Sequence, residues 1–340
     1  MKLQVLRIRI HAAVTAVARD MNSLLVALAA ALLLASALLP PLNLPRSTYD
    51  YVVVFDISQS MGVDDYELDG APVSRLDFAR AAARKALRDL PCGSRVGWAV
   101  FAEYRTLLLL SPIEVCDNYN DLLASLDNIE GRMRWGNASE ITKGVFWAMR
   151  VAKAAGDTPT LLFLTDGQEA PPLDPSQPLA MFDDVKRGEV AGWLMGVGGD
   201  TPRRIPKVDE EGRRIGYWRS YEVLQRFGGE PNAAAGTQPR EHLSSLREGH
   251  LRQVAQEVGF EYRRLTSLQS MSDAMRDTRF ARRTRQPTDI GWMAATLALL
   301  LLVIRFRPTF AAGDRAHPRA PAGEVSTSSA ARVSPAAGHG

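Results

Sequence analysis

Apolar and polar positions alternate along the chain in a way that predicts strands and helices in turn. Continuous apolar runs, typical of strands buried on both faces, cover residues 51–55, 160–164 and 189–197. Apolar residues spaced three to four apart predict helices at 74–90, 119–129, 140–155 and 246–258. A short strand at 260–265 and an antiparallel hairpin of 96–101 with 106–110 complete the pattern. This alternation predicts a mainly parallel sheet covered by helices.

Polar side chains follow two of the buried strands at the point where each strand ends. Asp56, Ser58 and Ser60 occupy alternate positions after the first strand, and Asp166 holds the equivalent position after the strand at 160–164. Because the carboxyl ends of neighbouring parallel strands lie at one edge of a sheet, these loops should face one crevice. Carboxylates and hydroxyls are the ligands that Mg²⁺ and Mn²⁺ prefer, so the pattern predicts a site for one of these ions.

A further hydroxyl is expected from the start of the helix at 140–155, where either Ser139 or Thr142 could supply it. We favour Ser139 because a helix N-terminus exposes its polar side chains to the crevice. The predicted metal-site residues are therefore Asp56, Ser58, Ser60, Ser139 and Asp166.

The two cysteines of the chain, Cys92 and Cys116, flank the predicted hairpin. If Phe101 faces Thr106 across the turn, the antiparallel register brings Cys92 opposite Val115, next to Cys116. This placement is compatible with a disulfide, which an extracytoplasmic location would permit. The alternative is a pair of free buried thiols.

Two apolar stretches lie outside the alternating region. Residues 21–45 carry no charge and follow a basic N-terminal region at 1–20, which predicts a transmembrane signal anchor or a cleaved signal peptide. The stretch at 289–306 is bordered by arginines and predicts a transmembrane helix, with a packed core helix as the alternative. Residues 307–340 are rich in Ala, Pro, Ser and Gly and are expected to form a disordered tail.

The composition and net charge of the chain limit the kinds of function that it can have. With 23% charged and 46% hydrophobic residues among 340, the chain can bury one sizeable core. The formal net charge of +3 is small and its arginines cluster beside the apolar stretches, so nucleic acid is not an expected partner. Residues 200–240, with Gly, Pro and mixed charges, break the alternation and are predicted to be an insertion or long surface loop.

Two enzyme classes share an apolar strand that ends in aspartate. A P-loop ATPase is excluded because the chain has no Gly-x-x-x-x-Gly-Lys-Ser/Thr motif. A phosphatase similar to the haloacid dehalogenases would use Asp56 as its nucleophile, but such enzymes usually carry a second aspartate where Ser58 stands. The phosphatase remains as an enzymatic alternative.

Three separated motifs resemble the metal-ion-dependent adhesion site of von Willebrand factor A domains: Asp56-x-Ser58-x-Ser60, a hydroxyl before a helix, and Thr165-Asp166-Gly167. The resemblance covers roughly residues 48–268 and implies a Rossmann-like α/β domain with Mg²⁺ above a mainly parallel sheet that has one antiparallel edge strand. In that family two serines and a threonine contact the metal, the aspartates act directly or through water, and an acidic residue of a protein partner completes the shell. Ser139 occupies the threonine position here. The resemblance implies a protein-binding module that is not an enzyme, with the phosphatase and a metal-independent structural scaffold as the alternatives.

The layout of the whole chain shows a narrower resemblance. An apolar segment, Asp-x-Ser-x-Ser-Met, an acidic loop, Ser-Arg-Leu-Asp-Phe-Ala-Arg and a closing apolar segment resemble membrane-anchored bacterial A-domain proteins of the Bat type and accessory proteins of methanol-dehydrogenase gene clusters. This resemblance implies a domain on the periplasmic side of the inner membrane, anchored in membrane lipid. It also implies a role in assembly or maturation of a periplasmic complex, with a MoxR-type AAA+ ATPase and sibling A-domain proteins as partners.

Overall fold

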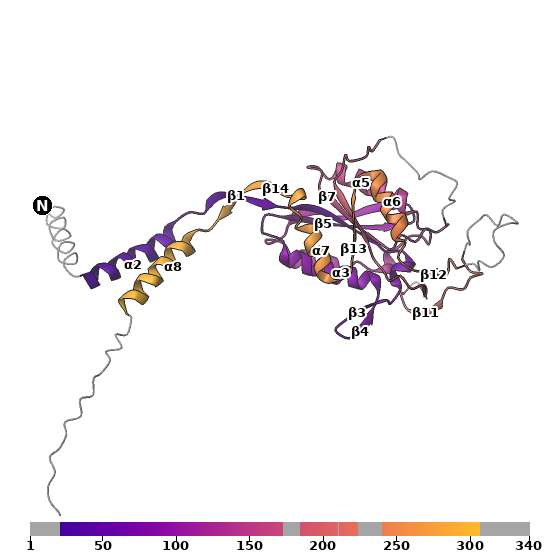
Figure 1. Cartoon of the computed structure of the whole chain (residues 1–340), viewed down its shortest axis with the longest axis horizontal. Coiled ribbons are helices and arrows are strands. Elements are labelled where there is room, and N and C mark those ends of the chain that lie inside the picture. Colours follow the sequence, from indigo (N-terminus) through magenta and orange to yellow (C-terminus); the bar gives the residue numbers. More distant parts are fainter. Residues whose placement is uncertain (1–20, 173–183, 210, 224–239, 307–340) are drawn as a thin grey trace, which may run out of the picture. The chain divides into compact units, whose positions relative to one another are not determined.

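The computed structural model describes residues 21–172, 184–209, 211–223 and 240–306, which fall into two compact units. The larger unit, Leu42–Thr288, is built around a six-stranded sheet (Figure 1). The strands of this sheet are β2 (Asp50–Asp56), β5 (Arg95–Ala102), β6 (Arg105–Glu114), β7 (Thr160–Thr165), β8 (Gly192–Gly196) and β13 (Glu261–Arg264). Their order across the sheet is β13-β8-β7-β2-β5-β6.

Every pairing in this sheet is parallel except that of β6, which runs antiparallel to β5 at one edge. Phe101 lies opposite Thr106, as the hairpin prediction required, and two register shifts follow farther along the pair. The prediction of a Rossmann-like domain with a mainly parallel sheet and one antiparallel edge strand is therefore confirmed.

Among the described residues, five helices cover the two faces of the sheet. They are α3 (Arg75–Asp89), α4 (Tyr119–Asp127), α5 (Ile141–Ala154), α6 (Glu248–Val258) and α7 (Leu268–Met275). One core lies between the sheet and α3, α4 and α7, and a second lies between the sheet and α5 and α6 (Figure 1). Because side chains alternate along a strand, Val53 and Phe55 of β2 enter the first core and Val52 and Val54 enter the second.

In the described ranges, four two-stranded ribbons lie outside the main sheet. They pair β1 (Leu42–Thr48) with β14 (Arg282–Thr288), β3 (Tyr66–Leu68) with β4 (Ala71–Val73), β9 (Arg203–Arg204) with β12 (Leu243–Ser244), and β10 (Pro206–Val208) with β11 (Arg214–Tyr217). Three 3₁₀ turns complete the described elements: η1 (Gln59–Gly62), η2 (Gly131–Met133) and η3 (Thr278–Phe280). The expected insertion at 200–240 thus contains strands β9, β10 and β11 in its described part.

A disulfide joins Cys92 and Cys116, whose Cα atoms lie 5.3 Å apart. The two residues flank the β5–β6 hairpin, where Val115 N donates to Ser94 O at 2.9 Å. The covalent bond closes a chain segment with a sequence separation of 24. It therefore ties the end of the antiparallel edge strand to the body of the sheet.

The smaller unit contains the helices α2 (Met21–Leu38) and α8 (Gly291–Arg305), which lie side by side. Within the described part of the chain, no helix has the length and apolar character needed to cross a membrane. The segments at 21–45 and 289–306, expected to be transmembrane helices, correspond to α2 and α8.

The apolar stretch predicted at 21–45 is helical only over Met21–Leu38. Two prolines, Pro40 and Pro41, follow the helix, and proline cannot continue a helical hydrogen-bond pattern. Residues 42–45, which the prediction assigned to the membrane segment, belong to β1 instead. The predicted basic region at 1–20 and the predicted tail at 307–340 lie outside the described residues.

Candidate metal centre

The carboxyl ends of β2 and β7 bring Asp56 and Asp166 to one edge of the sheet. The two strands are neighbours, with Phe55 opposite Leu164, so the loops that follow them meet. Both aspartates are wholly buried. Gly167 allows the sharp turn after Asp166, since its φ of 77° lies in the left-handed region that glycine adopts without strain.

Asp56 is held from both sides by short hydrogen bonds. Its Oδ1 accepts from Ser58 N at 2.8 Å, and its Oδ2 accepts from Thr165 Oγ1 at 2.6 Å. Burial and the nearby Asp166 carboxylate raise the pKa of Asp56 to about 7, although the hydrogen bonds from Ser58 and Thr165 oppose this shift. A cation at this edge would relieve the repulsion between the two carboxylates.

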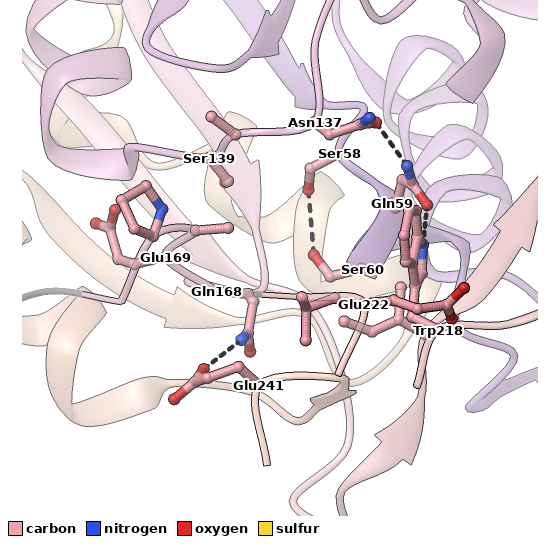
Figure 2. A pocket seen from close by; sticks show the side chains of 15 residues that line it. Ser58, Gln59, Ser60, Asn137, Ser139, Gln168, Glu169, Trp218, Glu222 and Glu241 are labelled. Atoms are coloured by element: carbon pink, nitrogen blue, oxygen red, sulfur yellow. Dashed lines mark hydrogen bonds between the residues drawn. The ribbon is translucent and has the colours of Figure 1, made fainter. Parts of the chain in front are cut away.

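Two serine hydroxyls project from the turn that follows Asp56. Ser58 precedes η1 and Ser60 lies within it, which places their Oγ atoms 3.1 Å apart (Figure 2). Ser60 is buried and Ser58 is partly exposed. Both line a pocket of about 330 Å³ at the carboxyl edge of the sheet, whereas the two aspartates do not line it.

Ser139 supplies a third hydroxyl from the loop before α5. Its backbone is fixed by Ala170, because Ser139 N donates to Ala170 O at 2.7 Å and Ala170 N donates to Ser139 O at 2.8 Å. Ser139 lines the same pocket as the two serines of the first loop, whereas Thr142 does not (Figure 2). Within the described part of the chain, the buried Oγ atom of Ser139 has no hydrogen-bond partner. A buried hydroxyl without a partner, beside two others, fits a bound cation.

A buried arginine completes the site, and the sequence analysis missed this role. Arg75, the first residue of α3, is wholly buried and donates from Nη1 to Asp166 Oδ2 at 2.6 Å. Its Nη2 donates to Asp65 Oδ2 at 2.7 Å, and Ser244 Oγ donates to Asp166 Oδ2 at 2.8 Å. Burial disfavours the charged guanidinium, but Asp166 and Asp65 outweigh it and raise the pKa of Arg75 above its ordinary value.

The burial of Arg75 could have been predicted from the spacing of apolar residues in the sequence. Arg75 stands three residues before Phe78 and four before Ala79. Ala82 and Ala86 continue this series at intervals of three to four residues. Helical periodicity therefore places Arg75 on the apolar face of α3, where an unpaired charge would be costly. The sequence analysis used this segment only as a helix start, which the structure also shows, because Ser74 Oγ accepts from Asp77 N.

The sequence analysis also did not predict the contact between two titratable residues, Glu169 and His250. Glu169 Oε2 accepts from Ile141 N at 3.1 Å at the start of α5, and its Oε1 lies 2.9 Å from His250 Nε2. Burial raises the pKa of Glu169, while His250 opposes the shift. The pair joins the loop after β7 to α6 and so fixes the pocket wall next to Ser139.

The match to a family model decides which domain this is. Residues 51–168 match the model described as von Willebrand factor type A domain. This part of the chain is a von Willebrand factor type A domain. The matched stretch of the A domain begins in β2, includes the three hydroxyls of the pocket and ends two residues after Asp166.

Solved structures resemble the A domain at low identity. An aerotolerance-related membrane protein from Bacteroides fragilis is 18% identical, with 67% of this chain and 96% of that chain covered and a TM-score of 0.44. The protein BatB from Bacteroides thetaiotaomicron is also 18% identical, with 68% and 98% covered and a TM-score of 0.48. No curated protein matches the chain.

Proposed function

We propose that the A domain is a metal-dependent protein-binding module and not an enzyme. Ser58, Ser60 and Ser139 would bind Mg²⁺ or Mn²⁺, with Asp56 and Asp166 acting directly or through water. The observation that carries this proposal is the buried Ser139 hydroxyl, without a partner in the described chain, in the same pocket as the paired hydroxyls of Ser58 and Ser60. When bound, the ion supplies a positive charge that attracts an acidic residue of the partner.

The residues of the chain have distinct roles in this proposal. The three hydroxyls face the pocket and contact the ion, while the two buried carboxylates behind them supply negative charge. Arg75 keeps Asp166 in position and offsets part of that charge. An ion held mainly by neutral hydroxyls on its open side keeps a net positive charge toward the pocket, which favours a carboxylate ligand.

A phosphatase that uses Asp56 as its nucleophile is not favoured. The Asp56 side chain is wholly buried, does not line the pocket, and accepts a hydrogen bond at each oxygen. A nucleophile must instead reach the phosphorus atom of its substrate.

We further propose a location at the bacterial inner membrane with the A domain on the periplasmic side. The Cys92–Cys116 disulfide supports an oxidising compartment. Exposed apolar side chains on α2 and α8, among them Leu34 and Trp292, offer a surface for membrane lipid. In this location the module would assist assembly or maturation of a periplasmic complex, with a MoxR-type AAA+ ATPase and sibling A-domain proteins as partners. The Bat-type layout of the sequence supports this role.

Affinity capture from detergent-solubilised native membranes tests the function. The baits are the wild-type chain with Mg²⁺, the wild-type chain with EDTA, and the Ser58→Ala variant, with Ser111→Ala on the exposed edge strand as the matched control. We expect the same partners to be lost with EDTA and with Ser58→Ala and retained by the control. Partners indifferent to both changes would indicate the metal-independent scaffold instead.

A further inference from the structure

The pocket beside the metal hydroxyls has an apolar wall that a bound carboxylate alone would leave uncovered. The apolar residues of this wall include Ala138, Ala170, Pro171, Ile205 and Trp218. Ile205 and Trp218 come from the insertion at 200–240, so the insertion turns the edge of the sheet into a pocket. The hydroxyls of Ser58, Ser60 and Ser139 line the same space.

The carboxylates that also line this pocket already have partners. Their contacts are Glu169 with His250 at 2.9 Å, Glu222 with Lys207 at 2.8 Å, and Glu241 with Gln168 at 3.1 Å. Figure 2 shows the Glu241–Gln168 contact at the pocket. Because these carboxylates already have partners within the protein, the apolar wall is the surface that a ligand gains most by covering.

Trp218 is fixed relative to the metal loops by side-chain hydrogen bonds. Its Nε1 donates to Gln59 Oε1, and Gln59 lies between Ser58 and Ser60 in sequence (Figure 2). The Gln59 Nε2 atom in turn donates to Asn137 Oδ1 at 2.6 Å, two residues before Ser139. Lys207 Nζ lies 4.6 Å from the centroid of the Trp218 ring. Side-chain hydrogen bonds therefore connect the aromatic wall to both loops that carry the three hydroxyls.

We propose that the acidic partner residue is flanked by an aliphatic residue, whose side chain packs in this pocket against Trp218 and Ile205. The inference rests on the proposed metal-dependent function and deepens it by naming the chemistry of the partner segment. A pocket of about 330 Å³ lies at the small end of the range for ligand sites, which suits one or two side chains of an extended segment.

Simple carboxylates test this inference on the full chain with saturating Mg²⁺. Ligand-observed proton NMR gives the Kd of acetate, butanoate, hexanoate and 6-aminohexanoate. We expect affinity to rise from acetate to hexanoate by about fourfold per buried methylene, and 6-aminohexanoate to bind more weakly than hexanoate. Hexanoate no tighter than acetate, or weaker than 6-aminohexanoate, would overturn the inference, the latter in favour of a basic flanking residue.

Variants test whether the pocket wall accounts for the higher affinity of hexanoate. Trp218→Ala should remove most of the advantage of hexanoate over acetate, whereas Trp218→Phe should retain most of that advantage. Trp292→Ala, which removes an exposed tryptophan of α8 in the other unit, is the matched control and should bind hexanoate as the wild type does. Equal hexanoate affinity for Trp218→Ala and the control would overturn the role of Trp218.

The two proposals fail in different ways. If all carboxylates bind equally, and all binding is lost with EDTA and with Ser58→Ala, the aliphatic subsite is wrong and the metal-dependent function stands. If hexanoate binds unchanged with EDTA and with Ser58→Ala, the pocket binds apolar acids without metal and the proposed function is wrong. A Mg²⁺-loaded chain that binds none of the carboxylates would overturn the inference.

Discussion

Arg75 Nη1 donates to Asp166 Oδ2 at 2.6 Å, and neither side chain is exposed to solvent. The same guanidinium also contacts Asp65, so one cation joins the start of α3 to two acidic loops. A buried charge of this kind is stable only because its partners are present. The pair therefore positions Asp166 behind the pocket.

We expect Arg75→Gln to reduce the free energy of unfolding by about 3–5 kcal/mol, because it leaves buried carboxylates without their partner. Urea unfolding of the full chain measures this loss. Arg84→Gln is the control, because its ion pair with Asp127 is 41% and 49% exposed at the two side chains. Such an exposed pair should contribute less than about 1 kcal/mol. Equal losses of unfolding free energy in the two variants would show that the buried ion pair stabilises the fold no more than the exposed one.

Asp56 should make stability depend on pH. Its pKa is about 7 in the folded domain and close to 3.8 when unfolded, so the folded form holds the extra proton between these values. Its contribution is therefore complete below about pH 4 and is lost as the pH rises through about 7.

The Asp56→Asn variant isolates this contribution, because asparagine does not titrate. In EDTA, we expect the stability of the wild type relative to this variant to fall by up to about 4 kcal/mol from pH 4 to pH 7. Urea midpoints at a series of pH values provide the measurement. A constant difference between the two proteins across this range would mean that Asp56 is ionised throughout.

The hydroxyl before α5 can be assigned by comparing two variants. Ser139 and Thr142 both have a buried hydroxyl without a partner in the described chain, but only Ser139 lines the pocket. We expect Ser139→Ala to weaken Mg²⁺ binding at least about tenfold, which is the usual effect of removing a ligand or its support. Thr142→Val should bind Mg²⁺ as the wild type does. The opposite result, measured by equilibrium dialysis, would make Thr142 the ligand.

Much of the fold could be predicted because its strands are buried on both faces. The expected strands at 51–55 and 160–164 correspond to β2 (Asp50–Asp56) and β7 (Thr160–Thr165). A short run of Val, Phe and Leu that is followed directly by polar turn residues is typical of a buried strand. The predicted strand at 189–197 was too long, because only Gly192–Gly196 forms β8.

The ribbons were harder to predict. The pairing of β1 with β14 joins Leu42 to Thr288, and no local pattern reveals contacts between residues so distant in sequence. The β3–β4 hairpin did have a signal, because Asp69-Gly70 is a typical two-residue turn. These residues have φ values of 51° and 79°, in the left-handed region that this turn requires.

The candidate site could be predicted only in part. The oxygen-bearing residues follow strands or precede a helix, and sequence spacing can identify such positions. The contact of Trp218 with Gln59 depends on how the insertion folds over the sheet edge, which its polar, glycine-rich sequence does not reveal.

The disulfide should contribute measurably to stability. Reduction of Cys92–Cys116 frees a segment with a sequence separation of 24, for which chain entropy predicts a loss of about 3 kcal/mol. Cys92→Ser with Cys116→Ser should match the reduced wild type in urea unfolding and should be insensitive to added reductant. A wild type that unfolds identically with and without reductant would contradict this expectation.

Calorimetric titration of Mg²⁺ into the full-length chain tests the central claim most directly. The account predicts one site per chain in the wild type and in Ser111→Ala, and loss of that binding in the double variant Ser58→Ala with Ser60→Ala. An absence of Mg²⁺ and Mn²⁺ binding by the wild type, or unchanged binding by the double variant, would contradict the assignment of these hydroxyls to a metal centre.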